Sequence, residues 1–200
     1  MNVKISKGNS KMGSIPSVSL PSGITCRQDC ACIFKCYARK LERLRPNVRQ
    51  SYEQNYRLLK CDPKTYWREV EAAVMMSRFF RFHVSGDIPD EDYFRHMIQI
   101  AAGNPHCEIL CFTKKYEIVN NVRCDIHTLP GNLHIIFSAW RGLTCNNPYG
   151  FPEAHVRYRD GTTTAKHCAV ECGGNCTDCA VTSGGCWVLK PGQQVVFNEH

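Results

Sequence analysis

The stretch Phe79-Phe80-Arg81-Phe82-His83-Val84-Ser85-Gly86-Asp87 indicates the fold class most directly. Its aromatic and β-branched first part, residues 79–84, predicts a strand, and the small polar turn 85–87 that follows presents an acid. Pro89-Asp90 then opens a helix that we expect to end at Gly103. A strand that runs through a polar turn into a helix is typical of an α/β protein.

The same alternation extends to both sides of this stretch. We expect helices at residues 37–43, at 49–59 after Pro46, and in the segment that follows Asp62-Pro63. At 116–121 we expect a short helix at most. Strands are expected at 107–112 and 133–140. Repeated β-α-β order predicts a parallel sheet. Because eight β-α units need about 250 residues, this chain of 200 residues predicts a shortened or partial (β/α) barrel with a Cys-rich N-terminal loop and a Cys-rich irregular C-terminal segment.

Composition and charge exclude two classes of protein. The chain is 43% hydrophobic, which supports a sizeable core and excludes a wholly disordered chain. No apolar run approaches the roughly 18 residues of a membrane helix, so we expect no membrane contact. Segment 1–23 lacks the apolar core of a signal peptide, which predicts a cytoplasmic protein. The net charge of +7 is weak evidence for a nucleic-acid partner, because two metal–thiolate sites would offset about four charges.

Fourteen cysteines are the most informative part of the composition. In a reducing compartment, so many thiols indicate metal binding rather than disulfides. They concentrate in two clusters near the two ends of the chain. We therefore divide the chain into an irregular segment 1–24, an α/β iron–sulfur domain 25–160, and a Cys-rich metal-binding segment 161–200 packed on the same domain.

The first cluster places four thiols within eleven residues: Cys26, Cys30, Cys32 and Cys36. Short spacings in a loop let thiolates wrap around a compact iron–sulfur core, whereas zinc sites are more often built from two separated C-x2-C pairs. We expect a [4Fe-4S] cluster here, with zinc and free thiols as the alternatives. The rings of Phe34 and Tyr37 are expected to shield the cluster from water.

The second cluster places five thiols within nineteen residues: Cys168, Cys172, Cys176, Cys179 and Cys186. Four thiolates close a metal site, so one thiol is spare. The C-x2-C pair favours a set of Cys168, Cys176, Cys179 and Cys186, with Cys172 as the spare thiol. Cys172 could instead replace Cys168, because the two differ by only one helical turn. A second iron–sulfur cluster and a zinc ion are both retained as occupants.

The turn Ser85-Gly86-Asp87 is a candidate cofactor site. Ligands of open α/β sheets bind at the carboxyl ends of the strands, where the Asp87 carboxylate can accept hydrogen bonds from an amine or a ribose. The alternative is a capped turn in which Asp87 satisfies backbone amides. Lys114 and Ser138 hold similar positions after the next two predicted strands.

Several of these residues together resemble the phage gene product 88 proteins. The resemblance rests on Cys26, Cys32 and Cys36-Tyr37-Ala38, on 82–87, and on Cys176, Cys179 and Cys186-Trp187. The tail 195–200 is also similar to that family, so the resemblance runs from about residue 22 to the end. Cys30 is an additional thiol inside the first motif. The resemblance implies a protein of a phage or its bacterial host, and a host-cytoplasmic location if it is phage-encoded.

That family is in turn distantly similar to radical S-adenosylmethionine enzymes. The similarity implies that three thiolates of the first cluster leave one iron open for S-adenosylmethionine, and that Ser85, Gly86 and Asp87 contact its amino group. Those enzymes typically carry C-x3-C-x2-C. This chain has Cys26-x3-Cys30 followed by Cys30-x5-Cys36, which departs from the pattern.

The leading hypothesis is an iron–sulfur protein with one or two [4Fe-4S] clusters, either a radical S-adenosylmethionine-like enzyme or a non-catalytic or electron-transfer protein. Its partners would be a redox protein or a small-molecule substrate. The rival hypothesis is a zinc-stabilised module that binds nucleic acid through its basic surface.

Overall fold

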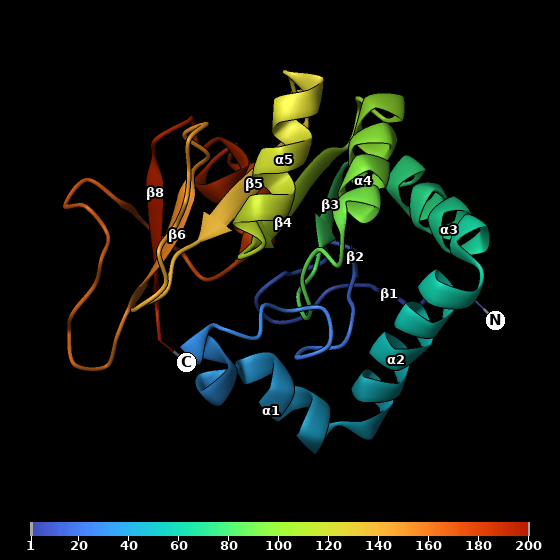
Figure 1. Cartoon of the computed structure of the whole chain (residues 1–200), viewed down its shortest axis with the longest axis horizontal. Coiled ribbons are helices and arrows are strands. Elements are labelled where there is room, and N and C mark those ends of the chain that lie inside the picture. The colour runs from blue at the N-terminus through green and yellow to red at the C-terminus, as the bar shows by residue number, and fades with distance from the viewer. Residues whose placement is uncertain (1, 200) are drawn as a thin grey trace.

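The computed structural model describes residues 2–199 and contains one sheet of eight strands (Figure 1). The strands are β1 (Ile5–Ser6), β2 (Ser17–Val18), β3 (Phe79–Phe82), β4 (Glu108–Thr113), β5 (Leu133–Ser138), β6 (Glu153–Arg157), β7 (Val170–Glu171) and β8 (Gln194–Asn198). Their spatial order is β1-β2-β3-β4-β5-β6-β8-β7, and every neighbouring pair except β1–β2 is parallel. This confirms the α/β class and the parallel sheet. β1 and β7 each have one partner, so the predicted barrel is not confirmed.

Among the described residues, six α-helices and two short 3-10 helices accompany the sheet. They are α1 (Tyr37–Leu44), α2 (Pro46–Cys61), α3 (Pro63–Met75), α4 (Glu91–Gly103), α5 (Tyr116–Ile126), α6 (Cys176–Val181), η1 (Ala31–Lys35) and η2 (Gly185–Trp187). The Asp62 carboxylate caps α3 by accepting from the Thr65 amide, as predicted. Pro46 starts α2, because proline suits the first position of a helix. The sequence predicted a short helix at most at 116–121. The helix α5 continues to Ile126, so the hydrophobic periodicity underestimated its length.

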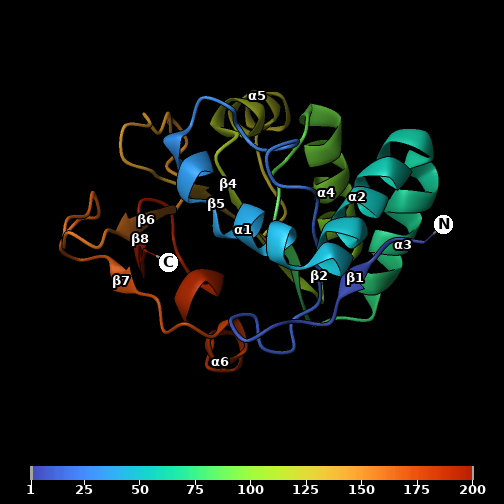
Figure 2. The same cartoon turned by 90° about the horizontal axis from the view of Figure 1, so that it is seen from below.

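Alternate residues of the central strands enter two separate cores. Phe80, Ile109 and Ile135 pack with α3, α4 and α5 on one face of the sheet. Leu110 and Ile136 face the other way. Figure 2 shows the strands along an arc, with α4 and α5 outside it and α6 on the inner side. The inner face is therefore covered by loops and by the short helices α6 and η2 instead of long helices.

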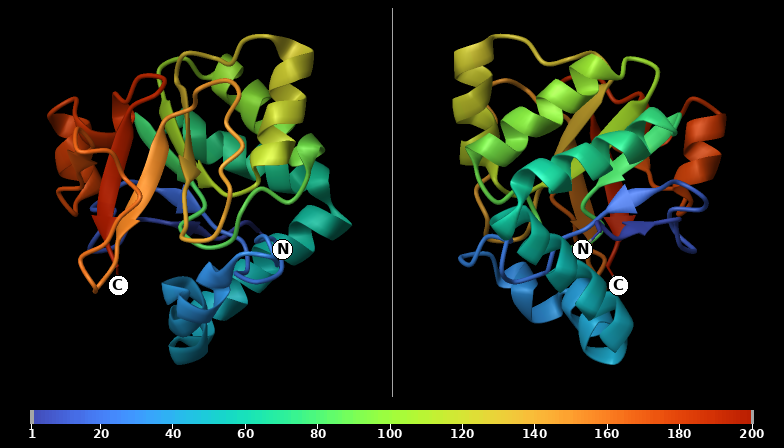
Figure 3. Two further views of the ribbon diagram at one scale, coloured as in Figure 1. Left: turned by 60° about the vertical axis from the view of Figure 1, so that its left-hand side comes forward. Right: turned by 90° about the vertical axis from the view of Figure 1, so that its right-hand side faces the viewer.

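The C-terminal segment and the N-terminal loop supply this inner layer. Met12, Ala180 and Trp187 are buried against the inner face. The Trp187 ring lies 5.0 Å from the ring of Phe79, and its Nε1 donates to the Cys176 carbonyl at 3.2 Å. The views in Figure 3 show β8 beside β6 near one end of the sheet and α2 and α3 near the other. Within residues 2–199, no helix combines the length and apolar composition needed to cross a membrane.

Candidate functional site at the carboxyl ends of β3 and β4

The turn Ser85-Gly86-Asp87 follows β3 and is held from three sides. The Ser85 carbonyl accepts from the Leu20 amide at 3.1 Å, and its hydroxyl donates to Glu42 of α1 at 2.7 Å. The Asp87 amide donates to Oγ1 of Thr25 at 3.0 Å. Thr25 immediately precedes Cys26, so the turn anchors the loop that carries the first cysteine cluster.

The Asp87 carboxylate is buried and fully engaged by protein donors. Its Oδ1 accepts from the Thr113 hydroxyl at 2.6 Å and from the Ile88 amide at 2.8 Å. Its Oδ2 accepts from the Lys114 amide at 2.9 Å. Burial raises the pKa of Asp87, and these hydrogen bonds oppose that rise. These contacts are the ones expected of a capped turn, and they tie the ends of β3 and β4 together.

The thiols of the first cluster are close enough to influence one another, and Cys26 is the one beside Asp87. Cys30 is buried, and Cys26, Cys32 and Cys36 are half-buried. The thiols of Cys30 and Cys32 share a hydrogen bond, while the charges of Cys36 and Asp87 both act on Cys26. Burial raises the pKa of Cys26 to about 11. The bond with Cys32 lowers the pKa of Cys30 to about 6 and raises that of Cys32.

Lys114 supplies positive charge to this group. It follows β4, and its ammonium acts on Cys26, Cys30 and Cys32. The sequence placed Lys114 at a strand end without assigning it a role. The expected shielding by aromatic rings is not observed for Phe34, a residue that is 89% exposed. Phe34 points outward because it belongs to the short turn η1, which has no buried residue.

The second group of thiols has Cys172 nearby, although the sequence favoured Cys168. The charge of Cys172 acts on Cys176, Cys179 and Cys186. The Cys172 amide donates to the Val196 carbonyl at 3.0 Å, which holds it where β7 meets β8. Cys168 and Cys172 are both exposed, and Cys168 lies before β7. The structure therefore brings Cys172 near the other three thiols, while Cys168 and Cys172 both remain candidates for the fourth ligand.

Neither group of thiols surrounds a single metal position. Within residues 2–199, no three side chains of His, Cys, Asp or Glu converge on a single metal position. A tetrahedral zinc site needs sulfurs about 3.8 Å apart, given its Zn–S bonds of about 2.3 Å. Each iron of a cubane takes its own thiolate, so cluster ligands are spaced more widely. The donor chemistry of both groups fits metal–thiolate binding, and side-chain rotation would be needed for a single ion.

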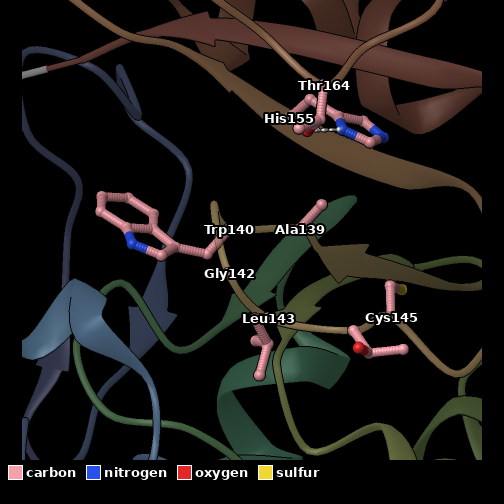
Figure 4. A pocket seen from close by; sticks show the side chains of 8 residues that line it. Ala139, Trp140, Gly142, Leu143, Cys145, His155 and Thr164 are labelled. Atoms are coloured by element: carbon pink, nitrogen blue, oxygen red, sulfur yellow. Dashed lines mark hydrogen bonds between the residues drawn. The ribbon is translucent and has the colours of Figure 1, made fainter.

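A pocket of about 340 Å³ opens after β5, next to the first site. Figure 4 shows Trp140 on one side of it and His155 with Thr164 on the other. His155 Nδ1 lies 2.8 Å from Thr164 Oγ1, and its Nε2 lies 3.0 Å from Glu153 Oε2. The Trp140 ring is 6.0 Å from the Lys114 ammonium. Sequence reasoning missed this pocket because its walls come from the loop after β5, from β6 and from the loop after β6, which only the tertiary packing brings together.

His83 is a buried, strained histidine at the start of the turn. Its backbone has φ of 62°, and it is 3% exposed. Neither ring nitrogen has a hydrogen-bond partner among the described residues. Burial, with a smaller effect of Arg81, lowers the pKa of His83 to about 3. The neutral imidazole is therefore the form compatible with the fold.

We expect acid to destabilise the protein through His83. Its pKa in the folded state lies below that of the unfolded chain, so stability is full above pH 6.5 and falls as the pH drops toward 3. The loss should approach about 1.4 kcal/mol per pH unit in this window. Urea unfolding of wild type and His83→Asn at several pH values measures it, since asparagine does not titrate and tolerates positive φ. Parallel pH profiles for the two proteins would contradict the assignment.

Comparison with protein families identifies the relatives of this chain. The model of the Gene product 88 family matches residues 2–143, which is more than half of the chain. The chain belongs to the gene product 88 family. The family match includes the first cysteine group and the turn at Asp87, and it ends before Cys168. The resemblance noted for the C-terminal cysteines and tail is therefore outside the matched range. No curated protein and no solved structure matches the chain, and similarity to radical S-adenosylmethionine enzymes is not shown.

Proposed function

We propose that this protein is an iron–sulfur protein that holds a [4Fe-4S] cluster through Cys26, Cys30, Cys32 and Cys36. The supporting observation is the grouping of these thiols at the carboxyl ends of β3 and β4, beside the Lys114 ammonium. Ligands of open α/β sheets bind at this edge. A positive side chain next to several thiols stabilises their ligating, deprotonated form.

The role of the chain would be to bind and orient the cluster. When bound, a cubane supplies one-electron transfer. The turn 85–87 fixes the loop through Thr25, and α1 begins directly after Cys36. Lys114 offsets the negative charge of the thiolates. With four thiols available, a closed site would serve electron transfer or structural support, and its partner would be a redox protein.

A radical S-adenosylmethionine-like enzyme is the second candidate. The observation that favours it is the position of Asp87, whose charge acts on Cys26. Cys26, Cys32 and Cys36 would then be the ligands, Ser85, Gly86 and Asp87 would face the amino group of S-adenosylmethionine, and the pocket beside Trp140 would take a small-molecule substrate. The three hydrogen bonds already made by the Asp87 carboxylate favour the non-catalytic role.

The first experiment is iron and sulfide analysis after anaerobic reconstitution. We expect wild type to absorb broadly near 400 nm, and the variant Cys26→Ser/Cys32→Ser/Cys36→Ser to contain about four fewer irons and sulfides per chain. Cys61→Ser, at an exposed thiol of α2, is the matched control and should retain them. A colourless protein with stoichiometric zinc and no sulfide would contradict the proposal and favour the zinc-stabilised, nucleic-acid-binding module.

The second experiment separates the two iron–sulfur roles. S-adenosylmethionine is added to the reduced protein, the cluster EPR signal is recorded, and 5′-deoxyadenosine is measured. For a closed site we expect an unchanged signal, no 5′-deoxyadenosine, and a disturbed cluster in Cys30→Ser. A shifted signal with product formation, tolerated by Cys30→Ser, would establish the enzyme instead.

A further inference from the structure

Glu153, His155 and Thr164 form a hydrogen-bonded chain of side chains that ends in the pocket after β5. His155 Nε2 lies 3.0 Å from Glu153 Oε2, and His155 Nδ1 lies 2.8 Å from Thr164 Oγ1. Figure 4 shows His155 and Thr164 side by side at the edge of the pocket. The His155 side chain is 6% exposed, whereas Thr164 is exposed. A carboxylate that orients a buried imidazole, which in turn reaches an accessible hydroxyl, is the arrangement that activates a nucleophile.

Glu153 sets the tautomer of the imidazole. Its Oε1 accepts from Asn147 Nδ2 at 3.0 Å, and its Oε2 accepts from Gln194 Nε2 at 3.1 Å. Burial acts to raise the pKa of Glu153, but hydrogen bonds from Asn147, His155 and Gln194 outweigh it and hold the pKa below its usual value. An ionised carboxylate only accepts, so His155 Nε2 carries the hydrogen that binds it. Nδ1 of the neutral imidazole then holds a lone pair, and the Thr164 hydroxyl donates to it.

The pocket beside this chain suits a small neutral substrate. Its volume is about 340 Å³, and none of the described residues that line it is Asp, Glu, Lys or Arg. Trp140 and Leu143 supply apolar wall. Among the described residues, no acceptor pairs with the backbone amides of Thr144 and Cys145, which belong to the same lining. These amides are therefore available to donate to a carbonyl oxygen on which negative charge develops.

Cys145 also lines the pocket, but its thiol is a poor nucleophile there. Burial raises the pKa of Cys145 to about 12, so the thiol stays protonated near neutral pH. The Thr164 hydroxyl instead has a base in direct contact. We infer that this pocket hydrolyses small neutral esters, with Thr164 Oγ1 as the nucleophile and His155 as the general base.

The reaction has two balanced steps. In the first, Thr164 Oγ1 bonds to the ester carbonyl carbon and its hydroxyl proton passes to His155 Nδ1. The bond from that carbon to the alcohol oxygen then breaks, and His155 gives the proton to the departing alcohol. In the second, His155 takes a proton from water, the water oxygen displaces Thr164 Oγ1 from the carbonyl carbon, and Oγ1 recovers the proton as the carboxylic acid leaves. Glu153 is a positioning residue, because it acts on the substrate only through His155.

This activity is separate from the proposed iron–sulfur function. It uses no thiol of either cysteine cluster and needs no electron transfer. The family match ends at residue 143, so Glu153, His155 and Thr164 lie outside the matched range. The inference therefore goes beyond the proposed function, and a failure of the metal proposal would leave it standing.

Turnover is tested with p-nitrophenyl acetate and the full chain, both metal-free and after anaerobic reconstitution, with equal rates expected in the two. We expect Thr164→Val to lower kcat/KM about 10²–10⁴-fold and Thr164→Ser to retain hydrolysis. Thr163→Val is the matched control, because Thr163 is a neighbouring exposed threonine outside the pocket lining, and it should match wild type. Urea unfolding of each variant separates loss of the hydroxyl from misfolding. Equal rates in wild type, Thr164→Val and Thr163→Val would overturn the inference.

The positioning role of Glu153 is tested by Glu153→Gln in the same assay. An amide can donate to His155 Nε2, which moves the hydrogen of the imidazole to Nδ1 and leaves the Thr164 hydroxyl without a base. We therefore expect kcat to fall with little change in KM. An unchanged kcat in a folded Glu153→Gln protein would overturn this role.

A fluorophosphonate probe tests the nucleophile independently of turnover. Thr164 Oγ1 would bond to phosphorus and displace fluoride, which leaves a stable adduct on the side chain. We expect peptide mass spectrometry to locate the adduct on Thr164 in wild type, and to find none there in His155→Gln that remains folded in the urea assay. Absence of the adduct from Thr164 in wild type, with or without labelling of cysteines or lysines elsewhere, would overturn the inference.

Discussion

Gly86→Ala is expected to lower the free energy of unfolding by about 2–5 kcal/mol. Gly86 has φ of +80°, where side chains other than glycine are strained. A Cβ at this position would lie 2.7 Å from the Leu20 carbonyl oxygen and 2.7 Å from Thr25 Oγ1. The first of these atoms is backbone and the second bonds the Asp87 amide, so relief requires the loop before Cys26 to move. Urea unfolding of the metal-free protein measures the loss.

Gly142→Ala is the matched control for this substitution. Gly142 has φ of +77°, and nothing lies within 4 Å of a Cβ built there. It therefore shares the backbone strain of Gly86 without the close contacts. We expect it to cost about 1 kcal/mol, and the difference between the two variants measures the contact with Leu20 and Thr25. Equal losses of unfolding free energy in the two variants would show that the loop before Cys26 can move without cost and that the turn does not anchor it.

Asp87→Asn is expected to cost about 2–3 kcal/mol of unfolding free energy. An amide can present its oxygen toward only one side of the site. If the asparagine oxygen faces the Ile88 amide, the asparagine NH2 group faces the Lys114 amide. In the reverse orientation, the NH2 group faces the Ile88 amide. Either way a buried donor faces another donor. The measurement is urea unfolding of the metal-free protein, which leaves cofactor binding out of the comparison.

Asp92→Asn, at an exposed carboxylate in the first turn of α4, is the control and should change stability by no more than about 0.5 kcal/mol. If Asp87→Asn were equally mild, Asp87 would not be holding β3 and β4 together. Its carboxylate would then be available for a ligand, which would strengthen the case for S-adenosylmethionine binding.

Local patterns were sufficient for the central elements of the fold. The runs 79–84, 107–112 and 133–140 predicted β3, β4 and β5 to within two residues, because buried parallel strands are nearly continuous apolar runs. The Asp62-Pro63 pair predicted the start of α3, because capping depends on adjacent residues. The other five strands were not predicted. β1, β2 and β7 have two residues each and no periodicity of their own, and the five-residue strands β6 and β8 were not recognised.

The sequence predicted some features of the candidate site and not others. The short spacings among Cys26, Cys30, Cys32 and Cys36 indicated a thiol group, because residues so close in a loop cannot separate far. The partners of Asp87 were not predictable, since Thr113 and Lys114 reach it only through the pairing of β3 with β4. The aromatic shielding assigned to Phe34 failed because sequence does not show which way a short turn faces.

By itself, the sequence determined the α/β class, the two cysteine groups and the strand that leads into the turn at Asp87, because each depends on neighbouring residues. The tertiary structure decided that Cys172 lies near Cys176, Cys179 and Cys186. It did so through the pairing of Val170–Glu171 with Val195–Val196, which brings the end of β7 against a strand some 25 residues away. Packing of α6 on the inner face of the sheet placed Arg81 beside Cys176. Spacing limits which thiols can meet, and only the packing of the sheet determines which of them do.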